Sequence, residues 1–332
     1  MFFSENRICL DINMLAPIVL FVYNRPWHTE QMLMALTSNE LASKSSLYVY
    51  CDGPKKGASE LDFKNICKVR SLIHRQKWCE NINVKVFDEN VGCRDIIIQG
   101  VTEVVSKYGK VIVLEDDIIT SPTFLNYMND ALEYYESRKT VFSISGHSHS
   151  PEKYLIPTDY EYDVYVSPRI FNWGWGTWLD RWIQTDWSFN YYDEFIKSEY
   201  QIEAFNRCGD DLTGMLTEEF DGKTSAWDIQ FTFAHFMNHA ISIIPCIPFT
   251  RNIGLDGSGT HCSINQPTVE IPLNLSHDIK FLNVLYEDKR IINSIHSSFL
   301  QKKRPLLQKI INRITRIVFG KSIFVLKSKV YK

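Results

Sequence analysis

The feature that most constrains the fold is the alternation of two apolar patterns in the first half of the chain. Four short runs rich in apolar residues are separated by segments with the three- to four-residue apolar spacing of amphipathic helices; the runs lie at 16–23, 45–51, 82–87 and 110–114. Such alternation is typical of βαβ units, in which helices cover both faces of a mainly parallel sheet. We therefore expect an α/β fold with a mixed, mainly parallel sheet and helices on both faces.

Three zones of different composition divide the sequence. Residues 1–150 hold the alternating segments, and residues 151–277 are richer in aromatic and small residues. Residues 278–332 are expected to be mostly helical and to end in a basic tail. We expect the first two zones to be parts of a single α/β domain.

Polar residues follow each of the four predicted strands. They are Asn24-Arg25, Asp52-Gly53, Asp88-Glu89-Asn90 and Glu115-Asp116-Asp117. The carboxyl ends of parallel strands meet at one edge of a sheet, where the ligands of such folds gather. The sequence therefore predicts a ligand site at this edge.

Three adjacent carboxylates, Glu115, Asp116 and Asp117, end the last of these strands. Three ionised carboxylates cannot easily share a buried strand end without a counter-charge. A divalent cation supplies that charge, and oxygen ligands suit Mn²⁺ or Mg²⁺, which take one or two protein carboxylates and complete their shell with phosphates and water. We expect Asp117 to bind the metal directly, with Asp116 and Glu115 facing the ligand or holding the loop. The alternative is a solvated acidic turn.

Three more residues at these strand ends are candidates for contact with a nucleotide. Arg25 can meet a diphosphate, and Asp52 can accept a hydrogen bond from a nucleobase or a ribose. Arg94, in the segment NVGCR, can approach a phosphate. Arg25 and Asp52 also have structural interpretations, as a surface arginine before a helix and as part of a turn-forming Asp-Gly pair.

Four tryptophans and two glycines lie close together in the segment FNWGWGTWLDRW. Aromatic faces stack on sugar rings, and glycine lets the backbone approach a ligand closely. Trp173 and Trp175 are expected on a loop that lines a sugar pocket. Trp178 and Trp182, which are four residues apart, are expected in the core.

A glycine-rich segment at 251–262 is a candidate lid. It contains three glycines and His261. A lid over a sugar donor would exclude water, which is the competing acceptor in a transfer reaction. A histidine of this kind is also compatible with a structural role.

In order and spacing, the segments IVLFVYNRP, YVYCDGP, NVGCRDIIIQGV and VIVLEDDIITSPTFLNYM resemble those of metal-dependent GT-A glycosyltransferases, which have a Rossmann-like fold. They look most like the N-acetylglucosaminyltransferase that begins complex N-glycan branching and its bacterial relatives, over residues 16–265. The resemblance implies that Asp117 binds Mn²⁺ under the donor diphosphate, that Arg25 matches the family's strand-end arginine, and that Asp52 contacts uridine. It also implies that SISGHS and FNWGWGTW line the sugar pocket and that PFTRNIGLDGSGTH matches a loop with a basic residue.

The segment SAWDIQF resembles the family's Trp-Asp pair at the start of a helix, which implies that Asp228 is the catalytic base. Chemistry supports the same role, because inverting glycosyl transfer needs a carboxylate that takes the proton of the attacking hydroxyl. Ser225 is expected to cap this helix, and Asp228 would lie near the positive end of its dipole. The alternative is an aspartate that only satisfies the helix N-terminus.

We therefore expect a metal-dependent, inverting glycosyltransferase that moves a hexosyl or N-acetylhexosaminyl group from a UDP-linked sugar to a glycan or lipid-linked acceptor, in surface glycan or lipopolysaccharide synthesis. Residues 1–150 would hold the nucleotide-sugar and the metal, and residues 151–277 the acceptor and the base. The N-terminal membrane anchor of the resembled family is not expected here, so its acceptor does not carry over. Two alternatives stay open: a sugar nucleotidyltransferase and a non-catalytic carbohydrate-binding protein.

The net charge of -3 hides a basic C-terminal tail. Residues 301–332 contain ten Lys or Arg and no acidic residue, whereas residues 1–300 contain 26 basic and 39 acidic residues. Apolar residues recur at helical spacing between 306 and 319. This pattern predicts an amphipathic helix that either binds an anionic membrane surface through residues 302–332 or packs on the domain. The acidic body disfavours nucleic acid as a partner.

The N-terminus and the cysteines indicate the compartment. Glu5, Arg7 and Asp11 precede any apolar run, which is unlike a signal peptide, and the run at 16–23 is too short to span a bilayer. The eight cysteines are scattered without a CxxC pair, which favours free thiols in a reducing cytoplasm. We expect a cytoplasmic protein whose tail can hold it on the inner face of the cytoplasmic membrane.

Overall fold

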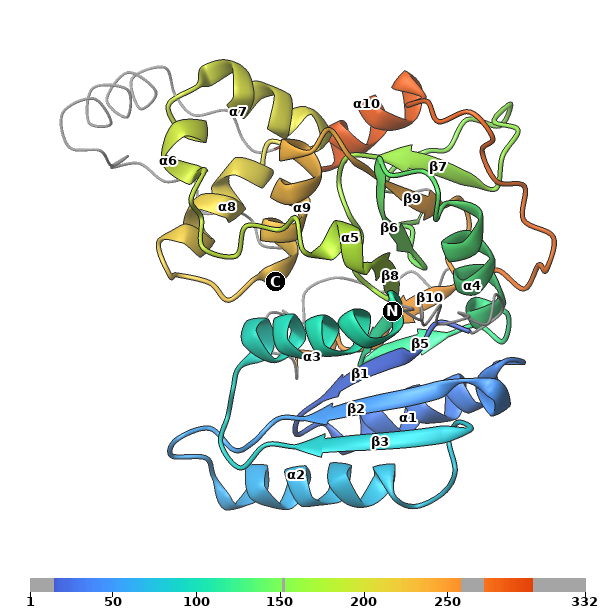
Figure 1. Cartoon of the computed structure of the whole chain (residues 1–332), viewed down its shortest axis with the longest axis vertical. Helices are drawn as coiled ribbons and strands as arrows, with labels where there is room; N and C mark the ends of the chain where they lie inside the picture. Colours follow the sequence, from blue (N-terminus) through green and yellow to red (C-terminus); the bar gives the residue numbers. More distant parts are fainter. Residues whose placement is uncertain (1–14, 151–152, 258–271, 301–332) are drawn as a thin grey trace, which may run out of the picture.

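Figure 1 shows the chain as a computed structural model, which describes residues 15–150, 153–257 and 272–300. All seven elements predicted for the first half of the chain are present. They are β1 (Ile18–Val22), α1 (Pro26–Thr37), β2 (Ser46–Cys51), α2 (Glu60–Ile73), β3 (Asn81–Val86), α3 (Cys93–Tyr108) and β4 (Lys110–Glu115). Short 3₁₀ turns occur at Ala42–Lys44 and, later in the chain, at Asn206–Cys208.

The second half of the described chain adds short strands and a group of helices. The strands are β5 (Ile118–Thr120), β6 (Val141–Ser145), β7 (Val164–Ser167), β8 (Trp175–Trp178), β9 (Ile241–Pro245) and β10 (Thr250–Asn252). The helices are α4 (Phe124–Tyr134), α5 (Leu179–Trp182), α6 (Tyr192–Phe195), α7 (Glu199–Phe205), α8 (Leu212–Phe220), α9 (Trp227–Met237) and α10 (Lys289–Ser298).

Eight of the strands form one sheet in the order β3-β2-β1-β4-β8-β6-β9-β7, while β5 and β10 form a separate two-stranded ribbon. The pairings of β1 with β2 and β4, of β2 with β3 and of β6 with β9 are parallel, and only β7 and β8 run against the others. The predicted α/β class with a mixed, mainly parallel sheet is confirmed. Because the sheet takes strands from both 1–150 and 151–277, these two zones share one core.

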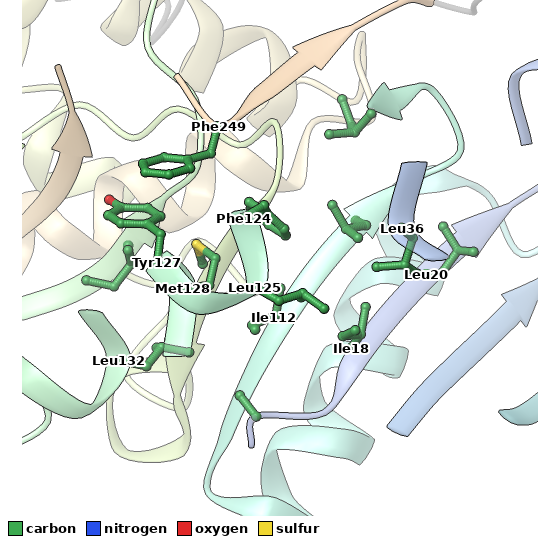
Figure 2. Packing of buried hydrophobic residues seen from close by; sticks show 14 of the residues in the cluster. Ile18, Leu20, Leu36, Ile112, Phe124, Leu125, Tyr127, Met128, Leu132 and Phe249 are labelled. Carbon is green, nitrogen blue, oxygen red and sulfur yellow. The ribbon is translucent and has the colours of Figure 1, made fainter. Parts of the chain in front are cut away.

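Alternate residues of β1 point to opposite faces of the sheet, and both faces are covered. Ile18 and Leu20 pack with Ile112 of β4 against helices α1, α2 and α4, as Figure 2 shows for α1 and α4. Val19 and Phe21 pack against α3 and α9 on the other face. A β-branched strand buried on both sides explains the continuous apolar runs of β1 and β4.

A second apolar cluster lies among the helices α6 to α10. It joins residues of α7, α8, α9 and α10 to Tyr165 of β7 and Ile244 of β9. Figure 1 shows α6, α7 and α8 gathered beside α9 at the top left. Helix α9 therefore has two buried sides, one toward the sheet and one toward this cluster, and its position is fixed from both.

Three predictions about the ends and the cysteines have different outcomes. Of the zone that begins at 278, the described part contains one helix, α10, after an irregular stretch, so the expectation of mostly helix is wrong for residues 278–288. The basic tail at 302–332 lies outside the described residues and stays a prediction. The six cysteines in the described ranges are free thiols. None of the helices described here has the length and apolar character needed to cross a membrane.

Candidate active site

The three carboxylates lie where the buried strand β4 ends. Glu115 is the last residue of β4, and Asp116 and Asp117 form the turn to β5. Asp116 and Asp117 are buried, at 5% and 7% exposure, and Glu115 is partly buried. The predicted alternative of a solvated acidic turn is therefore wrong.

Arg25 is the counter-charge of this cluster. Its Nη2 donates a hydrogen bond to Asp117 Oδ2 over 2.9 Å and a second one to Asp116 Oδ1, and its Nε lies 3.4 Å from Asp116 Oδ2. Arg25 precedes Pro26, the first residue of α1, at the end of β1. Since β1 and β4 are parallel neighbours, their carboxyl ends bring Arg25 and the aspartates together across 91 and 92 positions of sequence.

Burial and repulsion from neighbouring carboxylates raise the pKa values of Glu115 and Asp116. The pKa of Glu115 rises to about 8, because the side chain loses water and faces Asp117 and Asp116. The pKa of Asp116 rises to about 6 through burial, which the Arg25 guanidinium partly opposes. At neutral pH Glu115 therefore holds a proton.

The raised pKa of Glu115 predicts a pH-dependent stability. Between its ordinary value near 4.5 and about 8, the folded state binds more protons than the unfolded state, so the free energy of unfolding falls as pH rises. In the wild type the free energy of unfolding should fall by a value on the order of 3 kcal/mol between pH 5 and pH 8, and Glu115→Gln should remove this fall. Denaturant unfolding at both pH values measures this, with Glu103→Gln on the exposed face of α3 as the control. Equal pH slopes for wild type and Glu115→Gln would contradict the assignment.

The aspartates fit a divalent cation in ligand type and in number. Both carboxylates reach the same Arg25 nitrogen, so they converge on one position suited to positive charge. Mg²⁺ and Mn²⁺ take oxygen ligands, and one or two carboxylates suffice where phosphates complete the shell. Within the ranges the structure describes, no group of three or more His, Cys, Asp or Glu residues forms a metal site by itself. A metal here would depend on ligands from the substrate.

Asp228 lies in the first turn of α9, as predicted, and it is only partly exposed. Burial raises the pKa of its carboxyl, Asn172 donates to its Oδ2 over 3.4 Å, and the charge of Asp228 contributes to the raised pKa of Glu115. The predicted base and the acidic strand end therefore share one site. The predicted Ser225 cap is wrong: Ala226 precedes the helix, and its backbone N–H donates to Glu219 Oε2 over 2.7 Å.

Cys93 also belongs to this site, and no sequence motif singled it out. It is an exposed residue at the start of α3, yet the pKa of its thiol is raised well above its usual value. Burial by the surrounding protein is the main cause, followed by the charges of Glu115, Asp228 and both strand-end aspartates. The charges of all four carboxylates act on this one thiol, which agrees with their convergence at one site.

Asp52 has a structural role that its position at a strand end did not reveal. Its carboxylate accepts hydrogen bonds from the backbone N–H groups of Gly53, Val91 and Gly92 and from the Asn90 side chain, at 2.7 to 3.1 Å. It therefore ties the end of β2 to the loop that enters α3. A contact between Asp52 and a nucleoside stays a prediction and would require one of these bonds to open.

Arg94 connects α3 to α9. Its Nε donates to Gln230 Oε1 over 2.9 Å and lies 3.2 Å from Glu219, and its other nitrogens bind Asp95 and the Trp187 carbonyl. A guanidinium has five N–H donors, and these contacts leave few of them for a further partner. A contact between Arg94 and a phosphate stays a prediction and would compete with these partners.

The two tryptophans predicted to line a sugar pocket differ. Trp175 is in β8, only 3% exposed, and stacks on Trp227 with ring centroids 4.8 Å apart, so the expectation that it lies on a loop is wrong. Trp178 and Trp182 are buried, as expected. Trp173 precedes β8, is partly buried, and packs against His147 at 4.3 Å between centroids.

The described part of the glycine-rich segment lies on the acidic cluster. β10 pairs with β5, and Ile253 donates its backbone N–H to the Asp117 carbonyl over 2.9 Å. A Cβ at Gly254 would lie 2.2 Å from Asp117 Oδ2 and 2.8 Å from Arg25 Nη1, so any larger residue here would have to displace the ion pair. His261 lies outside the described residues, and its role stays a prediction.

Comparison with known proteins gives only distant similarity. No family model and no curated protein sequence matches the chain. Among solved structures, mannosyltransferase PcManGT from Pyrobaculum calidifontis, in complex with GDP-Man and Mn²⁺, aligns over 49% of this chain and 44% of its own, with a TM-score of 0.34 and 11% identity. S. aureus TarS 1-349 aligns over 71% of this chain and 60% of its own, with a TM-score of 0.39 and 11% identity.

A UDP-glucose pyrophosphorylase complexed with UDP-glucose aligns over 52% of this chain and 79% of its own, with a TM-score of 0.32 and 11% identity. The chain spans less than two thirds of the mannosyltransferase and of TarS 1-349. At these scores the likeness assigns neither a family nor an activity, so the function must be argued from the site.

Proposed function

We propose that the chain is a glycosyltransferase of the GT-A type, which moves a sugar from a nucleotide-sugar to an acceptor hydroxyl. The observation that carries the proposal is the convergence of two kinds of group at one edge of the sheet. Arg25, Asp116 and Asp117 form a charged cluster suited to a diphosphate and its cation. Asp228, whose charge is felt at Glu115, is a partly exposed carboxylate with a raised pKa.

The residues divide the work of an inverting transfer. Asp228 takes the proton of the attacking acceptor hydroxyl, and its raised pKa makes it a stronger base than an ordinary aspartate. Asp117 and Asp116 would hold Mn²⁺ or Mg²⁺, which neutralises charge on the departing diphosphate when it is bound. Arg25 orients the same diphosphate. Trp173, beside His147, offers a ring face to the sugar.

The finer parts of the proposal rest on the resemblance of the sequence segments to GT-A enzymes. We propose a UDP-linked hexose or N-acetylhexosamine as donor, inversion at the anomeric carbon, and a glycan or lipid-linked acceptor used in surface polysaccharide synthesis. A lipid-linked acceptor would agree with a tail at 302–332 that holds the enzyme on an anionic membrane.

Product analysis tests the reaction type. We expect one of a panel of UDP- and GDP-sugars, added with Mn²⁺, to raise the melting temperature of the full chain. Incubation of that nucleotide-sugar with the chain and candidate saccharide or lipid-linked acceptors should release a free nucleoside diphosphate. Release of pyrophosphate from a nucleoside triphosphate and a sugar phosphate would instead favour a nucleotidyltransferase. Absence of nucleotide binding would leave a carbohydrate-binding protein.

A further inference from the structure

Arg25 lies at the point on which the two aspartates converge. Its Nη2 contacts both Asp116 Oδ1 and Asp117 Oδ2, and its Nε approaches the second oxygen of Asp116 at 3.4 Å. The side chains of Arg25, Asp116 and Asp117 are 18%, 7% and 10% exposed. A cation that belongs to the protein therefore occupies the position that a metal between these carboxylates would need.

We infer that Arg25 and a divalent cation exclude each other at Asp116 and Asp117, so that Arg25 is a built-in competitor of the metal. This inference deepens the proposed function and rests on it for the identity of the site. Two positive groups cannot share one nitrogen-sized position between the same oxygens, and repulsion between them is little screened where water is scarce. Metal binding therefore requires the guanidinium to leave.

Two aspartates share one guanidinium at this site. The site therefore favours exchange of Arg25 for a divalent cation over a permanent ion pair. A buried charge-assisted hydrogen bond is strong, so moving the Arg25 guanidinium from the aspartates into water would cost free energy. A diphosphate offers the planar guanidinium anionic oxygens that can accept two of its hydrogen bonds in return. In the wild-type chain, metal binding should therefore be weak alone and should strengthen when a nucleoside diphosphate is present.

The loop after β10 holds Arg25 in the position that excludes the metal. A Cβ added at Gly254 would come within 2.8 Å of both Asp117 Oδ2 and Arg25 Nη1, and Ile253 is hydrogen-bonded to the Asp117 carbonyl. Two residues further on, Asp256 Oδ2 lies 3.1 Å from His28 Nε2 on α1. The loop thus lies beside the ion pair and is tied to Asp117 and to α1.

Mn²⁺ titration of the full chain, followed by the electron paramagnetic resonance of free Mn²⁺, tests the exclusion without any nucleotide. Arg25→Gln should bind one Mn²⁺ about 10- to 100-fold more tightly than wild type, the range expected when a charge-assisted competitor is removed. Arg75→Gln breaks an exposed ion pair with Glu30 (2.6 Å) and is the matched control, which should bind as wild type does. Adding Asp117→Asn to Arg25→Gln should abolish the gain.

Two results would overturn the inference: tight binding of one Mn²⁺ per chain by nucleotide-free wild type, or no gain in affinity in a folded Arg25→Gln. If Arg25→Gln does not fold, Arg25→Lys decides. Lysine keeps the positive charge but lacks the second donor arm of arginine. We therefore expect Arg25→Lys to raise the Mn²⁺ affinity by a few-fold, and the absence of this gain would overturn the inference.

A second arm repeats the titration of wild type with UDP or GDP, either of which should raise the Mn²⁺ affinity about tenfold or more. If neither UDP nor GDP raises the Mn²⁺ affinity of the wild type, while Arg25→Gln binds Mn²⁺ tightly without a nucleotide, the exclusion stands and the proposed nucleotide-sugar function fails. If a nucleotide-sugar is turned over but Arg25→Gln shows no gain, the function stands and the exclusion fails.

Discussion

Asp228→Asn is expected to lower the turnover number of sugar transfer by about 100-fold or more and to leave the affinity for the nucleotide-sugar nearly unchanged. Asparagine preserves the size of the side chain and can keep a hydrogen bond to Asn172, but it cannot take a proton. The loss should therefore appear in the chemical step. Single-turnover rates at saturating donor, together with a donor dissociation constant from titration, separate the two quantities.

Neighbouring carboxylates are poorly placed to replace Asp228. Asp211 forms two hydrogen bonds with Arg169, at 2.7 and 2.8 Å, and Glu219 Oε2 accepts from Ala226 and Thr224. Asp221, which is exposed and paired with Lys223, is the control: Asp221→Asn should keep the wild-type rate. A wild-type turnover number in Asp228→Asn would place the base elsewhere.

The pH dependence of the wild-type rate checks the same assignment. Because burial raises the pKa of Asp228, the base should lose its activity, as pH falls, at a pH above the ordinary aspartate range. In Asp228→Asn the residual rate should not show this fall at low pH.

Asp117→Asn is expected to reduce transfer below detection, because the variant loses the carboxylate that would hold the metal and, through it, the diphosphate. Arg25 still pairs with Asp116 in this variant, so the fold should persist. The measurement is product formation in Mn²⁺ and in EDTA, beside the circular dichroism spectrum. Asp88→Asn, at an exposed position just after strand β3, is the control and should remain active. Equal wild-type rates in EDTA and in Mn²⁺ would refute the metal role.

The parts of the fold that local sequence determines were predictable. β1 and β4 carry continuous apolar runs, and a strand that is buried on both faces needs such a run wherever it lies in the sheet. The parallel order of these strands then brings Arg25 to Asp116 and Asp117, because the ends of parallel neighbours coincide. This is why the charged cluster could be expected without knowledge of any contact.

Other features depend on partners that are remote in the sequence. Trp175 looked like a loop residue between two glycines, but Gly176 lets β8 pack closely against β4 and α4, and the strand is made by pairing with β4 and β6. Asp52 looked free to bind a ligand, but most of its hydrogen bonds come from residues about 40 positions away. Cys93 has no motif at all, and only the folded chain places it among four carboxylates.

The position of β8 limits how this chain can be assembled and divided. In the sheet, β8 lies between β4 and β6, although it follows both of them in the sequence. A growing chain that has just completed β6 cannot yet join that strand to β1–β4, because the antiparallel strand that bridges them comes about 30 residues later. A fragment that ends before β8 would expose a long unpaired edge of β4, which favours aggregation. Exchange of segments between chains of this fold should therefore replace loops around β8 and never the strand itself.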